Sequence, residues 1–294
     1  MTKEGQLKTV CLGDKNYPAL LKQIFDPPQK IYYRGNLKIC GQPCLAVVGS
    51  RKFTAYGQSV CEKIIAELNN TAVIISGLAY GIDAIAHRSA LEQGGLTIAV
   101  LGSGVDQSTI YPAGHRHLAE KIIQHGGLIM SEYPAGFAPT KYSFPKRNRV
   151  IAGLSQATLI IEAARKSGAL ITADCALDYN REVMAIPHPI NSPTGHGANE
   201  LIKKGAHLIT NSYDIINILK LEPAPKRAVS LRRTTATDKI ELCLSALLAK
   251  GQLNTDQIIR QSGFSASDVL TMLTMMEING RIKKTNDSTY FLNH

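Results

Sequence analysis

The stretch KYSFPKRNR, residues 141–149, combines four cations with two aromatic rings and contains no acid. Cations neutralise phosphates and ring faces stack on bases, and single-stranded nucleic acid presents both groups together. A duplex suits the stretch less well, because paired bases hide their faces. Pro145 restricts the backbone beside Phe144, and the cations stand just before an expected helix start. The stretch predicts a loop that binds a single strand; the alternative is a solvated basic loop with a buried Phe.

Four further stretches are rich in glycine and follow apolar runs. They are VVGSRKFTAYG (47–57), SGLAYGID (76–83), VLGSGVDQSTIYP (100–112) and EAARKSGALITA (162–173). Glycine lets backbone amides approach a phosphate, and the start of a helix adds partial positive charge. Turns between strands and helices favour glycine in any case, but four of them, two beside Arg or Lys, favour an anion site.

The common nucleotide fingerprints are absent from the sequence. Gln107 stands where GxGxxG needs its third glycine, and neither GxxxxGK[ST] nor GxSxG occurs. We therefore expect no cofactor, and no ATP or NAD bound in the usual way. The histidines lie among Pro, Gly and Asn, so we expect no metal site. Glu132 and Glu162 follow expected strands and could act as acid or base or anchor loop amides; we assign neither a catalytic role.

From residue 45 to about 220, the predicted elements that position these loops alternate regularly between strand and helix. Short β-branched apolar runs alternate with helical patterns such as GQSVCEKIIAEL, residues 57–68. Near-continuous apolar runs are typical of strands that are buried on both faces. We predict an α/β fold, an extended Rossmann-like doubly wound and mostly parallel sheet, whose loops form the site at the carboxyl ends of the strands.

The remaining segments differ in composition from this domain. Residues 1–44 are punctuated by proline and predict a short N-terminal extension to the Rossmann-like domain over 45–220. Residues 221–237 hold two prolines, four cations and one acid, as expected of an exposed linker. Residues 238–294 predict three helices and a terminal hairpin, which together make a small winged-helix domain. The middle helix is capped by Asn254 or Thr255 and ends at Gly263.

Composition sets outer limits on the function. The chain has 294 residues, a formal charge of +10 and 44% hydrophobic residues, as expected of a globular protein with a polyanionic partner. The first residues lack the apolar core of a secretion signal, and no apolar run is long enough to span a membrane. The six cysteines form no CxxC pair. We expect reduced thiols and a cytoplasmic protein.

The ordered motifs resemble the DNA processing protein A family (DprA, also called Smf). The resemblance covers residues 17 to 216 and rests on YYRGNL (32–37), VVGSRKFTAYG (47–57), SGLAYGIDAIAHRSAL (76–91), TIAVLGSGVDQSTIYP (97–112), SEYPAG (131–136), FPKRNRVIAGLS (144–155), EAARKSGALITA (162–173) and GANELIKKGAHLIT (197–210). It implies a homodimeric, non-enzymatic mediator of recombination. Such a protein binds incoming single-stranded DNA during natural transformation, protects it and helps to load the recombinase RecA.

The resemblance also nominates site residues. The GSR and FPKRNR loops and the adjoining loop carry Gly49, Ser50, Arg51, Phe144, Lys146, Arg147, Arg149, Lys166, Ser167 and Gly168. Two stretches depart from the family pattern. Tyr80 stands where many relatives carry a cation, and His188, His196 and Ala198 stand where Gly, Arg and Cys are usual. With Tyr80, the phosphate contact at this position is either absent or replaced by stacking.

Two other functions are compatible with parts of the chain. A Rossmann-type nucleotide phosphoribohydrolase of the lysine-decarboxylase-like (LOG) type would share the sheet but needs PGGxGTxxE, which is absent. A winged-helix regulator would read duplex DNA with its third helix. The first turns of that helix, SASDVLTMLTMM, carry no cation, and only the wing (Arg281, Lys283 and Lys284) is basic. We expect that helix to contact protein or duplex backbone rather than to read sequence.

Overall fold

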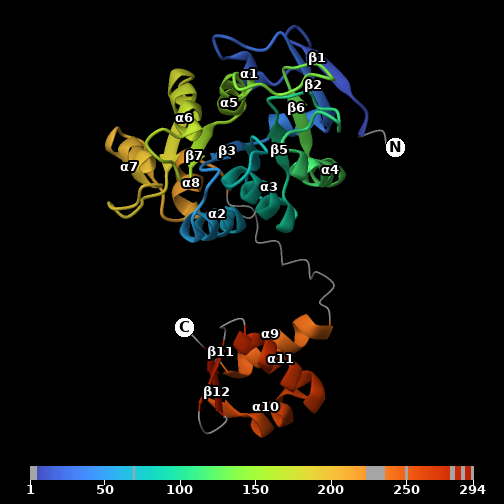
Figure 1. Cartoon of the computed structure of the whole chain (residues 1–294), viewed down its shortest axis with the longest axis vertical. Helices are drawn as coiled ribbons and strands as arrows, with labels where there is room; N and C mark the ends of the chain where they lie inside the picture. The colour runs from blue at the N-terminus through green and yellow to red at the C-terminus, as the bar shows by residue number, and fades with distance from the viewer. Residues whose placement is uncertain are drawn as a thin grey trace. The chain divides into compact units, whose positions relative to one another are not determined.

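The computed structural model describes residues 5–68, 70–222, 236–248, 251–278, 282–285 and 289–292. The chain divides into two compact units, residues 1–225 and 226–294, which are described separately (Figure 1). Within the described residues, no helix is both long and apolar enough to cross a bilayer. The predicted linker, 221–237, falls mostly on residues 223–235, which lie outside the described residues.

The larger unit is built on one nine-stranded sheet. Its strands are β1 (Lys8–Cys11), β2 (Lys30–Gly35), β3 (Cys44–Val48), β4 (Val73–Ser76), β5 (Thr97–Val100), β6 (Leu128–Ser131), β7 (Ala157–Ile160), β8 (Glu182–Ala185) and β9 (His207–Leu208). They are ordered β1-β2-β6-β5-β4-β3-β7-β8-β9. The run from β6 to β9 is parallel, and β2 pairs antiparallel with both β1 and β6. The predicted fold class is confirmed.

Helices cover both faces of this sheet (Figure 1). The α-helices are α1 (Ala19–Lys22), α2 (Ala55–Leu68), α3 (Ile82–Glu92), α4 (Arg116–Gln124), α5 (Ser143–Gly153), α6 (Gly168–Asp178), α7 (His196–Lys203) and α8 (Ser212–Leu219), with short 3₁₀ turns at Leu37–Gly41 and Ala113–His115. Alternate residues of a strand point to opposite faces. Ala46 and Val48 of β3 therefore pack in one core with α5 and α6, while Leu45 and Val47 pack with α2 and α3 in another.

The N-terminal segment departs from the expected appended extension. Its strands β1 and β2 continue the main sheet beyond β6, and Tyr32 of β2 pairs with Ser131 of β6. The described residues 5–44 are thus part of the larger unit. The other domain boundaries stay predictions.

The basic stretch at 141–149 also differs from its prediction. It was expected to be a loop that precedes a helix, but α5 already begins at Ser143, so three of its four cations lie on the helix. Pro145 occupies the third helical position, where the backbone needs no donor for an intrahelical bond. The rings and cations are therefore distributed around a helix, which fixes their directions.

The smaller unit has the predicted winged-helix order. It contains α9 (Ala236–Leu248), β10 (Leu253–Asn254), α10 (Thr255–Ser262), α11 (Ala266–Ile278), β11 (Ile282–Lys284) and β12 (Thr289–Leu292). Its sheet has the order β10-β12-β11, and its core joins Leu244, Ile258 and Leu273 from the three helices. Asn254 caps α10 by accepting a hydrogen bond from Gln257 N, and Gly263 ends it with a φ of 72°.

Candidate nucleic-acid interface

A pocket of about 510 Å³ opens beyond Val48, the last residue of β3. The strand order reverses between β3 and its neighbour β7, because β4 and β5 extend the sheet on one side and β8 and β9 on the other. Doubly wound sheets bind their ligands at this switch point. Six residues nominated from the sequence line the pocket: Gly49, Arg51, Phe144, Arg147, Ser167 and Gly168.

The first wall is the loop after β3, which is held tightly against α3. A Cβ atom added at Gly49 would lie 2.7 Å from Ile82 Cγ1, so a side chain at that position would force the loop away. Ile82 N donates to Ser50 O at 3.2 Å. Ser50 turns into its own loop, where its hydroxyl donates to Lys52 O at 2.7 Å. The loop thus presents its next side chain, Arg51, to solvent.

The second wall is the first turn of α5, with Phe144 at the pocket. The Arg51 guanidinium carbon lies 5.6 Å from the centre of the Phe144 ring, which is within the range of a cation–π contact. A Cβ at Gly102 would lie only 3.0 Å from Phe144 Cδ1, so glycine there makes room for the ring. The ring is half-buried, and the exposed cation lies over it. One base plane and one phosphate could be bound here together.

Arg147 forms the floor of the pocket and is only 4% exposed. Its Nη1 donates to Gly77 O at 2.6 Å and also to Val100 O, so it ties the ends of β4 and β5 together. Asp83 is buried nearby and accepts hydrogen bonds from Gly77 N and Ala79 N. Burial lowers the pKa of Arg147 to about 10 while Asp83 opposes that shift, so the guanidinium keeps its charge at neutral pH. Burial likewise raises the pKa of Asp83, although the Arg147 charge counteracts it.

The third wall is the start of α6. Ser167 caps this helix by accepting a hydrogen bond from Ala169 N at 3.3 Å. Asn148 Nδ2 donates to Gly168 O at 3.1 Å and so fixes α5 against α6. The amino end of α6 therefore faces the pocket with the partial positive charge of a helix start. Lys166 is exposed beside this turn but does not line the pocket.

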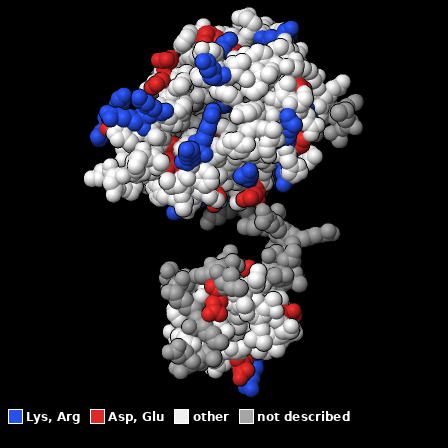
Figure 2. All heavy atoms as spheres, in the orientation of Figure 1, with Lys and Arg blue, Asp and Glu red and all other residues white. Residues whose placement is uncertain are grey.

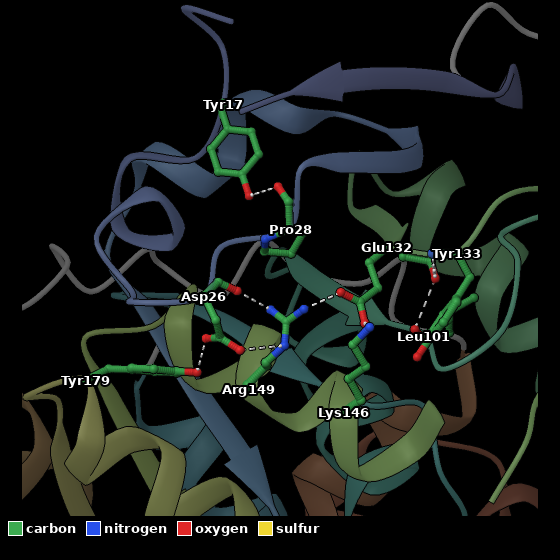
Figure 3. A network of polar contacts seen from close by, with 10 residues as sticks. Tyr17, Asp26, Pro28, Leu101, Glu132, Tyr133, Lys146, Arg149 and Tyr179 are labelled. Atoms are coloured by element: carbon green, nitrogen blue, oxygen red, sulfur yellow. Dashed lines mark hydrogen bonds and ion pairs between the residues drawn. The ribbon is translucent and has the colours of Figure 1, made fainter. Parts of the chain in front are cut away.

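Lys146 and Arg149 do not line the pocket but contact Glu132 beyond β6 (Figure 3). Lys146 Nζ lies 3.5 Å from Glu132 Oε1, and Arg149 Nη2 pairs with Glu132 Oε2. Arg149 Nε also lies 3.2 Å from Asp26 Oδ2, and its Nη1 donates to Asp26 O at 2.9 Å. Arg149 is 11% exposed and Lys146 57%. Lys146 remains accessible to a ligand, while Arg149 is enclosed by carboxylates.

Sequence reasoning did not nominate several residues that build the site. Asp83 and Asn148 line the pocket, and both stand inside quoted motifs; Lys141, one of the four cations of the basic stretch, lines it as well. Their polarity within glycine-rich or basic stretches is the signal that could have found them. Glu162, left open between acid–base chemistry and anchoring, is buried and accepts hydrogen bonds from Thr54 N and Thr54 Oγ1. That geometry is an anchor for the loop after β3.

Positive charge is unevenly spread over the surface. Figure 2 shows Lys and Arg in separate groups on the visible face of the larger unit, with acids between them. The pocket lining contains the cations Arg51, Lys141 and Arg147 against one acid, Asp83. Asp83 is buried, accepts hydrogen bonds from two backbone amides and lies near the charge of Arg147. The open part of the pocket is therefore positive. An anionic ligand with a flat ring fits this arrangement.

Family models match most of the chain. Residues 8–220 match the family described as DNA recombination-mediator protein A, and residues 225–287 match the DprA winged helix domain. Protein Smf of Escherichia coli is 38% identical over 278 residues, which cover 90% of this chain and 72% of that protein. The DNA processing protein DprA of Streptococcus pneumoniae is 43% identical over 217 residues, 74% of this chain and 76% of that one.

Two solved structures share the fold of the larger unit. The crystal structure of DprA from Streptococcus pneumoniae has a TM-score of 0.69 at 41% identity, covering 75% of this chain and 76% of that chain. DNA processing protein A from Helicobacter pylori, whose structure was described for its single-stranded DNA binding mode, has a TM-score of 0.65 at 35% identity. That match covers 73% of this chain and 96% of the other.

Proposed function

The chain belongs to the DNA recombination-mediator protein A family, and from this premise we propose that it binds single-stranded DNA in the pocket between β3, α5 and α6. It then protects the strand and helps to load RecA, as in natural transformation. It acts as a homodimer in the cytoplasm, where incoming strands and RecA meet, and it catalyses no reaction. The RecA-loading, dimeric and non-catalytic parts rest on the family resemblance alone.

One observation carries the DNA-binding part of the proposal: the exposed guanidinium of Arg51 lies over the Phe144 ring at the mouth of a positive pocket. A base that stacks on the ring would place its phosphate beside Arg51 and the amino end of α6. Stacking contributes about 1–3 kcal/mol per base, and each phosphate contact adds salt dependence. Double-stranded DNA keeps its base faces stacked on one another, so it could use only the cations.

Fluorescence anisotropy with labelled single-stranded and duplex oligonucleotides at two salt concentrations tests the proposal. We expect tighter binding of the single strand, with affinity that falls as salt rises. Phe144→Ala should weaken single-strand binding by roughly 5- to 150-fold, which is the loss of one stacked base. Arg51→Ala should weaken it and also flatten the salt dependence.

Lys63→Ala is the matched control for the charge change at Arg51. Lys63 lies on α2 and pairs with Glu67 rather than lining the pocket, so its removal should leave affinity within about twofold. Equal affinity for duplex and single strand, or indifference to both pocket variants, would overturn the assignment of this pocket.

A further inference from the structure

A row of exposed rings leaves the pocket toward the loops after β4 and β5. The Tyr111 ring lies 5.6 Å from the Phe144 ring between centroids, and 48% of Tyr111 is exposed. Tyr80 is 52% exposed, and its ring contacts that of His115 with centroids 4.8 Å apart. Tyr111 lies just before the 3₁₀ turn Ala113–His115, and His115 is the last residue of that turn. Large aromatic faces that remain open to solvent at a ligand-binding edge are available for stacking.

A rigid frame holds the Tyr80 ring in place. The loop before it is fixed by Asp83, which accepts hydrogen bonds from Gly77 N and Ala79 N. Gly81, which follows it, adopts a φ of 84° and packs against the loop after β3. On the other side, buried His115 has its Nδ1 2.8 Å from Leu78 O. A ring that is already ordered loses little conformational freedom when a base stacks on it.

A basic recess lies beyond Tyr80. It has a volume of about 240 Å³, and its polar and charged lining residues are Arg88, Glu92, His117 and Lys121, with Gly114 at its edge. A Cβ at Gly114 would lie 3.5 Å from the Tyr80 hydroxyl oxygen, so the ring borders the recess. Across the part of the chain that the structure describes, Arg88 and Lys121 form no ion pair. The recess therefore offers two exposed cations against one acid.

We propose that a bound single strand continues from the pocket across Tyr111 and Tyr80 and places later phosphates against Arg88 and Lys121. This inference rests on the proposed function, because the strand must first enter the pocket at Phe144. The order of groups suits a single strand, with cations at both ends of a path and rings between them. Tyr80 then supports the strand by stacking.

A length series separates this inference from the proposed function. Oligothymidylates of about 4 and 16 nucleotides span the site sizes of single-strand-binding folds. We expect Tyr80→Ala to weaken binding of the long strand about tenfold, equivalent to about 1.4 kcal/mol, and to leave the short strand unchanged. Tyr80→Phe keeps the ring and should bind both like the unchanged protein. Tyr213→Ala, which removes a tyrosine from α8 that is somewhat more exposed than Tyr80, is the matched control and should alter neither.

The chain contains no tryptophan, so Tyr80→Trp introduces a single reporter at the proposed stacking position. Its fluorescence should be quenched by the long strand and not by the short one. For the recess, Arg88→Gln and Lys121→Gln should each reduce the slope of log affinity against log salt by about 0.7 with the long strand.

Each other outcome has a definite meaning. If Tyr80→Ala binds long and short strands like the unchanged protein, or weakens both equally, the extended path is wrong while the pocket assignment stands. If Phe144→Ala has no effect at either length, or the unchanged protein binds neither strand, the proposed function fails and this inference fails with it.

Discussion

Arg147 and Arg149 stand two positions apart on α5 and have different surroundings. Arg147 faces the pocket floor and donates to the carbonyl oxygens of Gly77 and Val100, while Arg149 lies between Asp26 and Glu132. A helix turns about 200° over two residues, so neighbouring cations of one motif reach opposite sides. If residues 144–149 formed one loop, both arginines could serve as phosphate ligands. The structure separates them into a pocket floor and an anchor for the N-terminal segment.

We predict that Arg147→Met destabilises the protein strongly. The variant would leave Asp83 as a buried carboxylate without its cation and two buried carbonyl groups without a donor. Each buried polar group that loses its partner costs about 1–3 kcal/mol. Urea denaturation would measure this as a lower midpoint. Arg51→Met, which removes an exposed arginine from the same pocket, should change stability by less than about 0.5 kcal/mol. Equal stability of the two variants would mean that Arg147 does not support the pocket.

His87 provides a pH-dependent test of the packing beneath the site. It is fully buried on α3 and its Nδ1 lies 2.6 Å from Thr97 Oγ1. Burial, followed by the charges of His115, Arg147 and Arg88, lowers the pKa of His87 from 6.5 to about 3. Between those values the unfolded chain binds a proton that the folded chain does not. Stability should therefore fall as pH drops from 6.5, by about 1.4 kcal/mol per pH unit from this group.

The comparison that isolates this effect is His87→Phe, which fills the site with a ring that does not titrate. Its stability, followed by urea denaturation from pH 7 to 4, should decline less steeply than that of the unchanged protein. Parallel curves for the two proteins would show that His87 does not carry the acid sensitivity.

At the scale of elements, the sheet was predictable and its edge was not. The parallel strands β3 to β7 are short apolar runs that are buried throughout. Such runs can be recognised as buried strands from the sequence alone. Strands β1 and β2 are only partly buried and lie among prolines, so nothing local distinguishes them from an extended loop. The place of β2 in the sheet depends on its pairing with β6, a contact between residues about a hundred positions apart, and β1 joins the sheet only through β2.

The same limit applies to the candidate site. Glycines and cations after apolar runs located the loops after β3 and β7, because the carboxyl ends of parallel strands share one edge. The direction of each side chain was not predictable without the helix boundary at Ser143. Asn148 donates to Gly168 O in a separate loop, and a linear pattern cannot show which loop a polar side chain will reach. Asp83 folds back on its own turn, where it accepts from Gly77 N.

The N-terminal segment is tied to α5 and α6 by the polar network in Figure 3. Tyr179, which directly follows α6, donates to Asp26 Oδ1 at 2.7 Å, and Arg149 on α5 pairs with the same carboxylate. We predict that Arg149→Met destabilises the protein by about 3–5 kcal/mol, since the buried Glu132 carboxylate loses its closest cation. Single-strand affinity under folding conditions should change less than tenfold.

Lys146→Met is the comparison for this anchor, because Lys146 contacts the same carboxylate from a more exposed position. Its stability should change by less than about 1 kcal/mol. Hydrogen exchange should show faster opening of residues 17–28 in Arg149→Met and not in Lys146→Met. A variant at Arg149 that stays stable but loses single-strand binding would make this arginine a DNA ligand after all.

At the scale of the whole molecule, positive charge belongs to the part of the chain that holds the pocket. Residues 237–294 contain six cations and six acids, so the other residues keep the whole formal charge of +10. In α11, Ser265 and Asp268 form the cap, and the hydroxyls of Thr271 and Thr274 donate to carbonyl oxygens one turn earlier. These polar side chains form their hydrogen bonds within α11 itself. The wing cations Arg281, Lys283 and Lys284 have side chains outside the described residues.

We therefore predict that deleting residues 237–294 leaves single-strand affinity within tenfold. The truncated chain keeps the pocket, the ring row and an unchanged net charge, so stacking and counterion release should persist. Anisotropy at two salt concentrations would measure this, with circular dichroism to confirm that the larger unit remains folded. The matched comparison is the full-length Phe144→Ala variant, which loses one stacked base and keeps both units. A folded truncation that binds as weakly as Phe144→Ala would move part of the single-strand site to the smaller unit.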